Sequence, residues 1–293
     1  MTAAEGMGDT DYGSVGDGYA RVRRTDPRIA ALVHAALGDA RTVVNVGAGA
    51  GSYEPADRHV LPVEPSSTMR ALRPPHLAPA VRGVAQALPL DDDSVDAAMA
   101  MITVHQWPDP VAGLREMRRV ARGPVLVLTF DGDELGRLWL MDYVPELRRV
   151  EASRYPAIGT IAAELGADTA IHEVPIPLDC VDGFTEAFYG RPEALLDPAV
   201  RRAQSAWGFL EPGVEERAVR ALAADLASGA WDERYGFHRT RPHFHGAVRL
   251  IVGRKPDARY PTPDAGRRTG ACRRRRVQRG RPPGSRARSQ RSW

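Results

Sequence analysis

Residues 43–51 are Val-Val-Asn-Val-Gly-Ala-Gly-Ala-Gly, and this stretch decides the fold. The valine-rich first half is typical of a buried strand. Glycine at every second position of the second half permits backbone angles that other residues avoid, and it lets a ligand lie against the backbone. A strand that runs into such a loop is how an α/β sheet forms a nucleotide site at the carboxyl ends of its strands.

The spacing of these glycines indicates which kind of nucleotide binds. A dinucleotide fingerprint requires a third glycine at position 52, where it allows a helix and a strand to pack closely. This chain has Ser52 at that position. The residue therefore argues against dinucleotide binding. A non-catalytic or NAD-binding Rossmann protein is kept as an alternative.

Three further motifs follow in order. Residues 60–64 form a candidate strand that ends in Glu64, whose carboxylate can accept hydrogen bonds from both hydroxyls of a ribose. Residues 85–99 run from Ala-Gln-Ala-Leu-Pro-Leu through three aspartates into a second candidate strand, and residues 102–107 are Ile-Thr-Val-His-Gln-Trp. Together with the glycine loop, these motifs resemble class I S-adenosylmethionine-dependent methyltransferases of the type 11, small-molecule branch. The resemblance covers about residues 12–130.

The resemblance implies a Rossmann-like α/β fold with a seven-stranded, mostly parallel sheet and helices on both faces. In this family the last strand is antiparallel and inserts between the fifth and sixth strands. Residues 81–85 are the expected third strand, and residues 171–178 are the expected sixth strand, distorted by Pro175 and Pro177. A small helical lid is expected in the insertions at residues 131–170 and 183–230, although the first insertion could also be a packed pair of surface helices.

The cofactor implied by the resemblance is S-adenosylmethionine. The family usually has an acid where this chain has Asn45. An arginine of the N-terminal segment, residues 12–24, could pair with the methionine carboxylate, or the segment could be a solvated amphipathic turn. The residues expected to bind the cofactor are Tyr12, Arg23, Gly47, Gly49, Gly51, Glu64, Pro65, Met69, Ala85, Gln86, Ile102 and Thr103.

His105 and Tyr19 are the candidate catalytic residues. A hydroxyl or N–H acceptor must lose a proton during methylation, and histidine is well suited to accept one near neutral pH. His105 follows the expected fourth strand, where this fold would place it beside the reactive methyl group, and Tyr19 could orient His105 or the acceptor. The alternative is that His105 only packs or hydrogen-bonds to the backbone.

Charge divides the chain into a body and a tail. The net charge is +3, and the 12 Arg and 2 Asp of residues 257–293 give that segment +10, which leaves −7 for the rest. We expect a disordered N-terminus at residues 1–11, a methyltransferase domain at residues 12–256 and a disordered basic tail at residues 257–293. The tail is the one feature that supports RNA as an alternative substrate.

The expected acceptor is a small, aromatic or apolar metabolite of specialised metabolism, methylated on oxygen, nitrogen or carbon. No Asn-Pro-Pro-Tyr motif follows the expected fourth strand, and a nucleic-acid partner is not favoured. A homodimer is left open. The chain shows no signal pattern, membrane span or metal-ligand spacing, so a cytoplasmic protein without a metal is expected.

Overall fold

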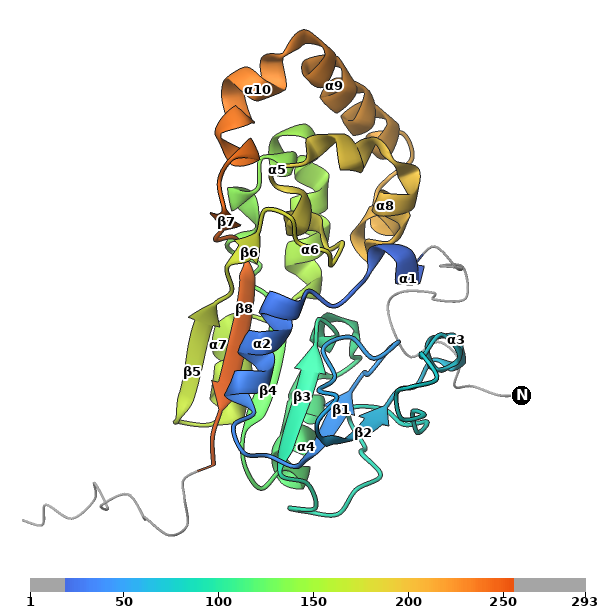
Figure 1. Ribbon diagram of the computed structural model, residues 1–293, viewed down its shortest axis with the longest axis vertical. Coiled ribbons are helices and arrows are strands. Elements are labelled where there is room, and N and C mark those ends of the chain that lie inside the picture. Colours follow the sequence, from blue (N-terminus) through green and yellow to red (C-terminus); the bar gives the residue numbers. More distant parts are fainter. Residues whose placement is uncertain (1–18, 256–293) are drawn as a thin grey trace, which may run out of the picture. The chain divides into compact units, whose positions relative to one another are not determined.

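A six-stranded sheet forms the centre of residues 19–255, the part of the chain that this computed structural model describes (Figure 1). The strand order is β2-β1-β3-β4-β8-β5; the first four strands are parallel, and β8 is antiparallel to both of its neighbours. This confirms the expected fold class, including the place of the last strand. The strands are β1 (Thr42–Val46), β2 (His59–Val63), β3 (Ala97–Met101), β4 (Val125–Phe130), β5 (Thr169–Glu173) and β8 (Val248–Gly253).

The expected third strand, at residues 81–85, is reduced to one bridge to β2, so the sheet has six strands and not seven. Val81 donates its N–H to the carbonyl of Pro62 (2.9 Å) and accepts the N–H of Glu64 (3.0 Å). The expectation of a full strand at residues 81–85 is therefore wrong. The next acceptor on this side of β2, the carbonyl of Glu64, accepts Nη1–H of Arg70 at 2.8 Å in place of a strand N–H.

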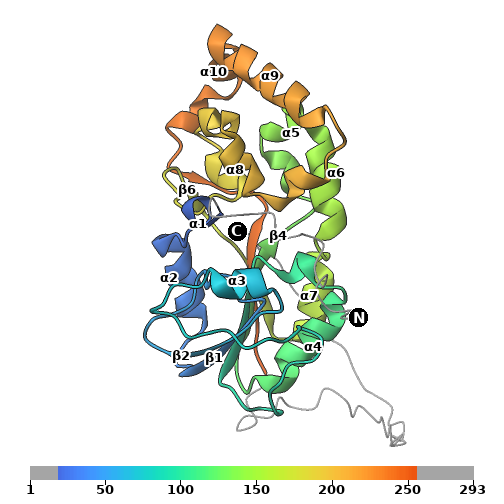
Figure 2. The same cartoon turned by 90° about the vertical axis from the view of Figure 1, so that its right-hand side faces the viewer.

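Two helical layers cover the faces of the sheet (Figure 2). Asp26 is the N-cap of α2, because its side chain accepts the N–H of Arg28 at 3.0 Å. Val43 and Met99 belong to the core beneath α2, whereas Val44 and Ala98 belong to the core beneath α4 and α7. This alternation follows the period of two along a strand. The helices are α2 (Pro27–Ala36), α4 (Pro110–Val120) and α7 (Ile158–Leu165).

A group of helices gathers beyond the carboxyl ends of the parallel strands, and we call it the helical lobe (Figure 1). Its core is aromatic: the rings of Trp139 and Trp231 meet edge to face at 5.2 Å, and Trp139 donates its N–H to the carbonyl of Tyr189 at 2.7 Å. The lobe consists of α5 (Leu140–Tyr143), α6 (Pro145–Arg154), α8 (Pro198–Arg202), α9 (Val214–Ser228) and α10 (Ala230–Tyr235).

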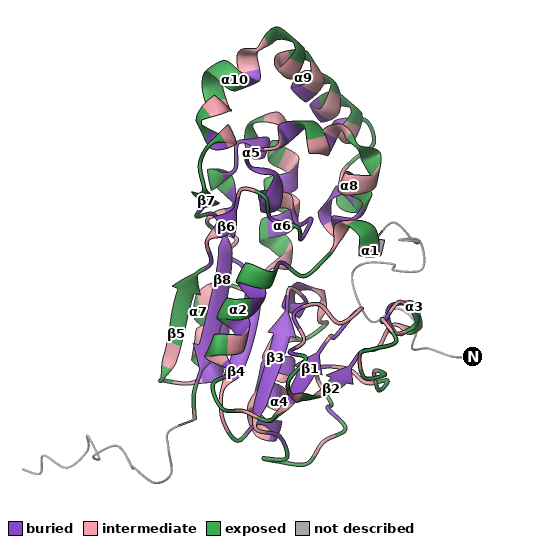
Figure 3. Cartoon of the chain, viewed as in Figure 1, coloured by how far each residue is buried: buried purple, intermediate pink, exposed green. Residues whose placement is uncertain are grey.

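Two expected segments are divided differently in the structure. Within the expected insertion at residues 131–170, α7 packs on the sheet, because Ile161 and Leu165 are fully buried in the core shared with α4. Within residues 171–178, the strand is interrupted before Pro175, and a short strand β6 (Ile176–Pro177) pairs with β7 (His243–Phe244). Figure 3 shows β5 as an exposed edge of the sheet, in contrast to the fully buried strands β3, β4 and β8.

Other sequence expectations concern residues that the structure does not describe. The segments at residues 1–11 and 257–293 lie outside the described residues, as does Tyr12. Tyr19 begins the short helix α1 (Tyr19–Val22), and its description is limited to the backbone.

Candidate functional site

The glycine loop after β1 uses backbone conformations that favour glycine. Gly47, Gly49 and Gly51 have φ angles of +67°, +51° and +98°. A Cβ atom on Gly47 would collide with Oγ1 of Thr103, and one on Gly51 would collide with Leu77. At Gly49 the nearest atom would be Cε of Met69 at 3.3 Å, so the space above this glycine is comparatively open. The loop therefore presents its backbone to a ligand at Gly49.

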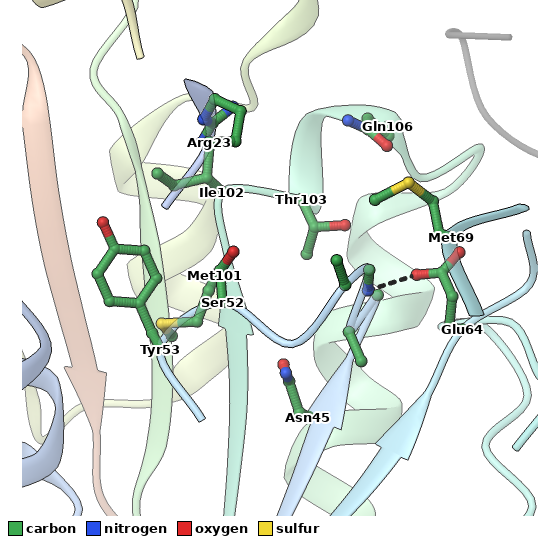
Figure 4. Close-up of a pocket in the computed structure, with 14 residues that line it drawn as sticks. Arg23, Asn45, Ser52, Tyr53, Glu64, Met69, Met101, Ile102, Thr103 and Gln106 are labelled. Atoms are coloured by element: carbon green, nitrogen blue, oxygen red, sulfur yellow. Dashed lines mark hydrogen bonds between the residues drawn. The ribbon is translucent and has the colours of Figure 1, made fainter. Parts of the chain in front are cut away.

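Glu64 is held rigidly at the end of β2. Its Oε2 accepts the N–H of Gly49 at 2.8 Å (Figure 4), and its Oε1 accepts the N–H of Ser66 at 2.8 Å. The residue is 6% exposed, and burial raises the pKa of its carboxyl group against the opposing effect of these two N–H donors. Each carboxylate oxygen can accept more than one hydrogen bond, so the group retains acceptor capacity.

An open cavity lies around this loop. Arg23 and Tyr53 line one end of it, and Glu64 and Met69 line the other (Figure 4). The two ends differ in charge, because one carries a guanidinium group and the other a carboxylate. The cavity is lined by Arg23, Asn45, Gly47, Ala48, Gly49, Ala50, Ser52, Tyr53, Glu64, Met69, Met101, Ile102, Thr103 and Gln106.

The structure brings only part of the expected cofactor set to this cavity. Gly51 packs under the loop against Leu77. Ala85 is buried beneath α4, where a Cβ atom added to Gly113 would lie 3.0 Å from Cβ of Ala85. Lining the cavity are Arg23, Gly47, Gly49, Glu64, Met69, Ile102 and Thr103, whereas Gly51, Pro65, Ala85 and Gln86 do not line it. Their roles in binding stay predictions.

His105 is next to a lining residue of the cavity but does not itself line it. It is 8% exposed, and its ring centroid is 4.8 Å from that of Tyr155. The next residue, Gln106, lines the cavity, and its Nε2 is 3.4 Å from Nε2 of His105. The ring of Phe130 is 5.3 Å from that of Tyr155 on the other side. His105 therefore belongs to an aromatic cluster at the carboxyl end of the sheet, beside the cavity.

The structure adds residues that the motifs did not identify as part of the site. Asn45 donates Nδ2 to Oε1 of Glu54 at 2.9 Å, and Glu54 pairs with Arg73 at 2.8 Å, with both charged side chains at most 3% exposed. The side-chain nitrogen of Asn45 is assigned to the position that faces the Glu54 carboxylate, and its oxygen Oδ1 therefore points away from Glu54. Asn45 Oδ1 is buried and has no hydrogen-bond partner within residues 19–255, although Asn45 lines the cavity. No sequence motif links positions 45, 54 and 73, which explains why this network was missed.

Residues 19–255 contain no group of three or more His, Cys, Asp or Glu side chains that could hold a metal ion. Within the same range, no helix is both long and apolar enough to cross a membrane.

Comparisons with known proteins agree with this arrangement. A family model described as a methyltransferase domain matches residues 44–127. Uncharacterised methyltransferases of Mycobacterium bovis and Mycobacterium tuberculosis are 34% identical over an alignment of 149 residues that covers 47% of this chain. The chain spans 56% of the length of these curated relatives.

A solved structure from Anabaena variabilis covers more of the fold. That protein is provisionally described as a methyltransferase from an antibiotic biosynthesis pathway. It is 28% identical, has a TM-score of 0.73, and is aligned over 80% of this chain and 99% of its own length. The likeness therefore extends well beyond the segment that the family model matches.

Proposed function

The chain belongs to the class I S-adenosylmethionine-dependent methyltransferases, and on that premise we propose that it transfers a methyl group from S-adenosylmethionine to a small-molecule acceptor. The observation that carries the proposal is the cavity around the glycine loop, with the fixed carboxylate of Glu64 at one end and the guanidinium of Arg23 at the other.

The residues of the cavity fit this cofactor. Glu64 would accept hydrogen bonds from the ribose hydroxyls, and Arg23 would pair with the methionine carboxylate. The buried Oδ1 of Asn45, which has no partner within the described residues, would accept a hydrogen bond from the ammonium group. The backbone at Gly49 leaves room for the chain between these groups.

When bound, the cofactor supplies an electrophilic methyl group on a positively charged sulfur. The protein must then align the acceptor with that carbon and exclude water, and such positioning is a large part of catalysis in a displacement reaction. We assign proton removal from a hydroxyl or N–H acceptor to His105, which lies next to the cavity-lining Gln106. Tyr19, at the start of α1, is assigned to orienting His105 or the acceptor.

Two observations support a small aromatic or apolar acceptor. His105, Tyr155 and Phe130 form a continuous aromatic cluster beside the cavity, and rings of this kind pack well against flat apolar molecules. The Anabaena relative, provisionally described as part of an antibiotic biosynthesis pathway, aligns over nearly its whole length. A role in specialised metabolism is therefore part of the proposal.

A transfer assay tests the proposal. The chain is incubated with S-adenosylmethionine labelled on the methyl group and with separate pools of phenols, heteroaromatic amines, apolar acids and total RNA. We expect label in a small organic product. Label in RNA, lost at high salt as electrostatic binding requires, would contradict the proposal. A chain that ends at Lys255 serves as a control, since every lining residue of the cavity precedes that position.

A further inference from the structure

Residues 179–183, which we call the clasp, dock against residues 22–28 at the start of the described chain. Gly183 donates its N–H to the carbonyl of Val22 at 2.9 Å, and Val181 donates its N–H to Oδ2 of Asp26 at 3.1 Å. A Cβ atom on Gly183 would lie 2.7 Å from the carbonyl oxygen of Val22, so this close approach requires glycine. The clasp thus fixes the chain segment that carries Arg23.

Asp182 is the residue of the clasp that reaches the lining of the cavity. It is 1% exposed. Its Oδ1 accepts Nε–H of Arg23 at 2.7 Å, and its Oδ2 accepts the hydroxyl proton of Tyr53 at 2.7 Å. Arg23 and Tyr53 both line the cavity but come from different parts of the chain (Figure 4). One buried carboxylate therefore joins two walls of the cavity.

Tyr53 occupies an unusual backbone position. Its φ angle is +65°, which is rare for a bulky residue, and its side chain is 1% exposed. Its N–H bonds to Oγ1 of Thr25 at 3.0 Å, and its carbonyl lies 3.0 Å from Nε2 of His34. Burial, together with the charge of Asp182, raises the pKa of Tyr53 well above its usual value, so the hydroxyl keeps its proton and donates it. Strained backbone that several surrounding contacts hold in place is concentrated at functional sites.

We propose that Asp182 is a positioning residue, which orients Arg23 and Tyr53 at the end of the cavity that takes the amino-acid part of the cofactor. The inference rests on the proposed function. A guanidinium group is planar, so a hydrogen bond at Nε restrains the direction in which the remaining N–H groups point. Asp182 itself lies behind Arg23 and Tyr53 and does not line the cavity.

A structural role alone would have a different signature. If the ion pair of Asp182 only stabilised the fold, its loss would weaken the binding of every ligand of the cavity to a similar extent. If it orients Arg23, the loss falls on ligands that carry the amino-acid carboxylate. S-adenosylhomocysteine carries that group, and 5′-methylthioadenosine contains the same nucleoside without it. The comparison of these two ligands separates the two roles.

The test is calorimetric titration of both ligands into the full chain and three variants, with the thermal midpoint of each variant measured alongside. Asp182→Asn removes the charge at constant shape, and Tyr53→Phe removes one hydrogen bond. Asp179→Asn is the matched control, because its carboxylate is in the same clasp but its side chain is 80% exposed. We expect Asp182→Asn to weaken the binding of S-adenosylhomocysteine by about tenfold or more and the binding of 5′-methylthioadenosine by less than about twofold. The control variant should bind both ligands as the parent chain does.

The outcomes are distinct. Equal losses for the two ligands, or unchanged affinity for both, would overturn the role of Asp182 while the proposed function stands. If the parent chain binds neither ligand, the proposed function fails first. If Asp182→Asn does not fold, Tyr53→Phe decides: a selective loss of about threefold or more for S-adenosylhomocysteine supports the inference, and an equal loss for both ligands overturns it.

Discussion

The side-chain amide of Asn45 donates to the carboxylate of Glu54 at 2.9 Å, so the buried acid beneath the glycine loop comes from residue 54 and not from residue 45. Arg73 pairs with the same carboxylate at 2.8 Å and places Nη1 3.3 Å from the carbonyl of Gly49. The family resemblance leads one to expect an acid at position 45. In this chain a neutral amide is required at position 45, because the side chain that it contacts, Glu54, is already an acid.

Replacing Asn45 with the acid that the family usually carries should therefore destabilise the protein. Asn45→Asp places two carboxylates in contact in a buried site with one arginine. We expect a loss of about 1–3 kcal/mol in the free energy of unfolding, measured by urea denaturation at pH 8. The double variant Asn45→Asp with Glu54→Gln should recover much of this loss, because the amide and the acid have then exchanged places. An Asn45→Asp variant as stable as the parent chain would contradict this account.

Gly49→Val should abolish cofactor binding while the protein remains folded. A β-branched side chain at a φ angle of +51° is strained, and it projects into the space where the cofactor backbone would lie. Circular dichroism and titration with S-adenosylhomocysteine measure the two effects separately. The matched control is Gly159→Ala in α7, where a Cβ atom would meet nothing within 4 Å. Normal affinity in Gly49→Val would mean that the cofactor binds elsewhere.

His105→Ala tests the proposed base. Removal of a general base should lower turnover by roughly a hundredfold or more and leave cofactor affinity unchanged, with partial recovery at high pH, where the acceptor ionises unaided. Once an acceptor is known, the measurement is turnover as a function of pH together with the affinity for S-adenosylhomocysteine. Near-normal turnover would remove His105 from the chemistry and leave alignment as the main catalytic contribution.

Glu186 should make stability depend on pH. It is 2% exposed, and burial raises the pKa of its carboxyl group from 4.5 to about 7 against the opposing hydrogen bond from the N–H of Ala247. A raised acid pKa means that the folded state binds the proton more tightly than the unfolded state. The resulting stability is complete below pH 4.5 and is lost as the pH rises through about 7.

Urea denaturation between pH 4.5 and 8 measures this effect. The contribution of Glu186 to the free energy of unfolding should change by at most roughly 3 kcal/mol over this pH range. Arg249 and Glu151 are the other charged groups that influence this carboxyl, and both remain in the variant Glu186→Gln. The free energy of unfolding of Glu186→Gln should fall less steeply with pH than that of the parent chain. Parallel profiles for the two proteins would show that Glu186 does not titrate in this range.

The sequence predicts the fold well where local patterns and topology agree. The valine-rich strand before the glycine loop is a central strand, and its hydrophobic run identifies it without tertiary information. The edges of the sheet are harder to predict, because an edge strand depends on partners that the pattern does not contain. Residues 81–85 keep a single bridge to β2, and the strand at the other edge ends before Pro175.

The candidate site was predictable only in part for a similar reason. Motif spacing indicates Gly49 and Glu64, because both follow strands whose carboxyl ends meet at one edge of the sheet, and the structure joins them by a hydrogen bond of 2.8 Å. Tyr53 and Asp182 are 129 positions apart, and their contact exists only in the folded chain. No local pattern carries such a contact, so these residues emerge only from the structure.

The central claim is that the cavity around Gly49 and Glu64 binds S-adenosylmethionine, and titration calorimetry with S-adenosylhomocysteine and, separately, NAD tests it most directly. We predict saturable binding of S-adenosylhomocysteine with one site per chain, no detectable heat with NAD, and loss of the signal in Gly49→Val. Binding of NAD without binding of S-adenosylhomocysteine would contradict the account.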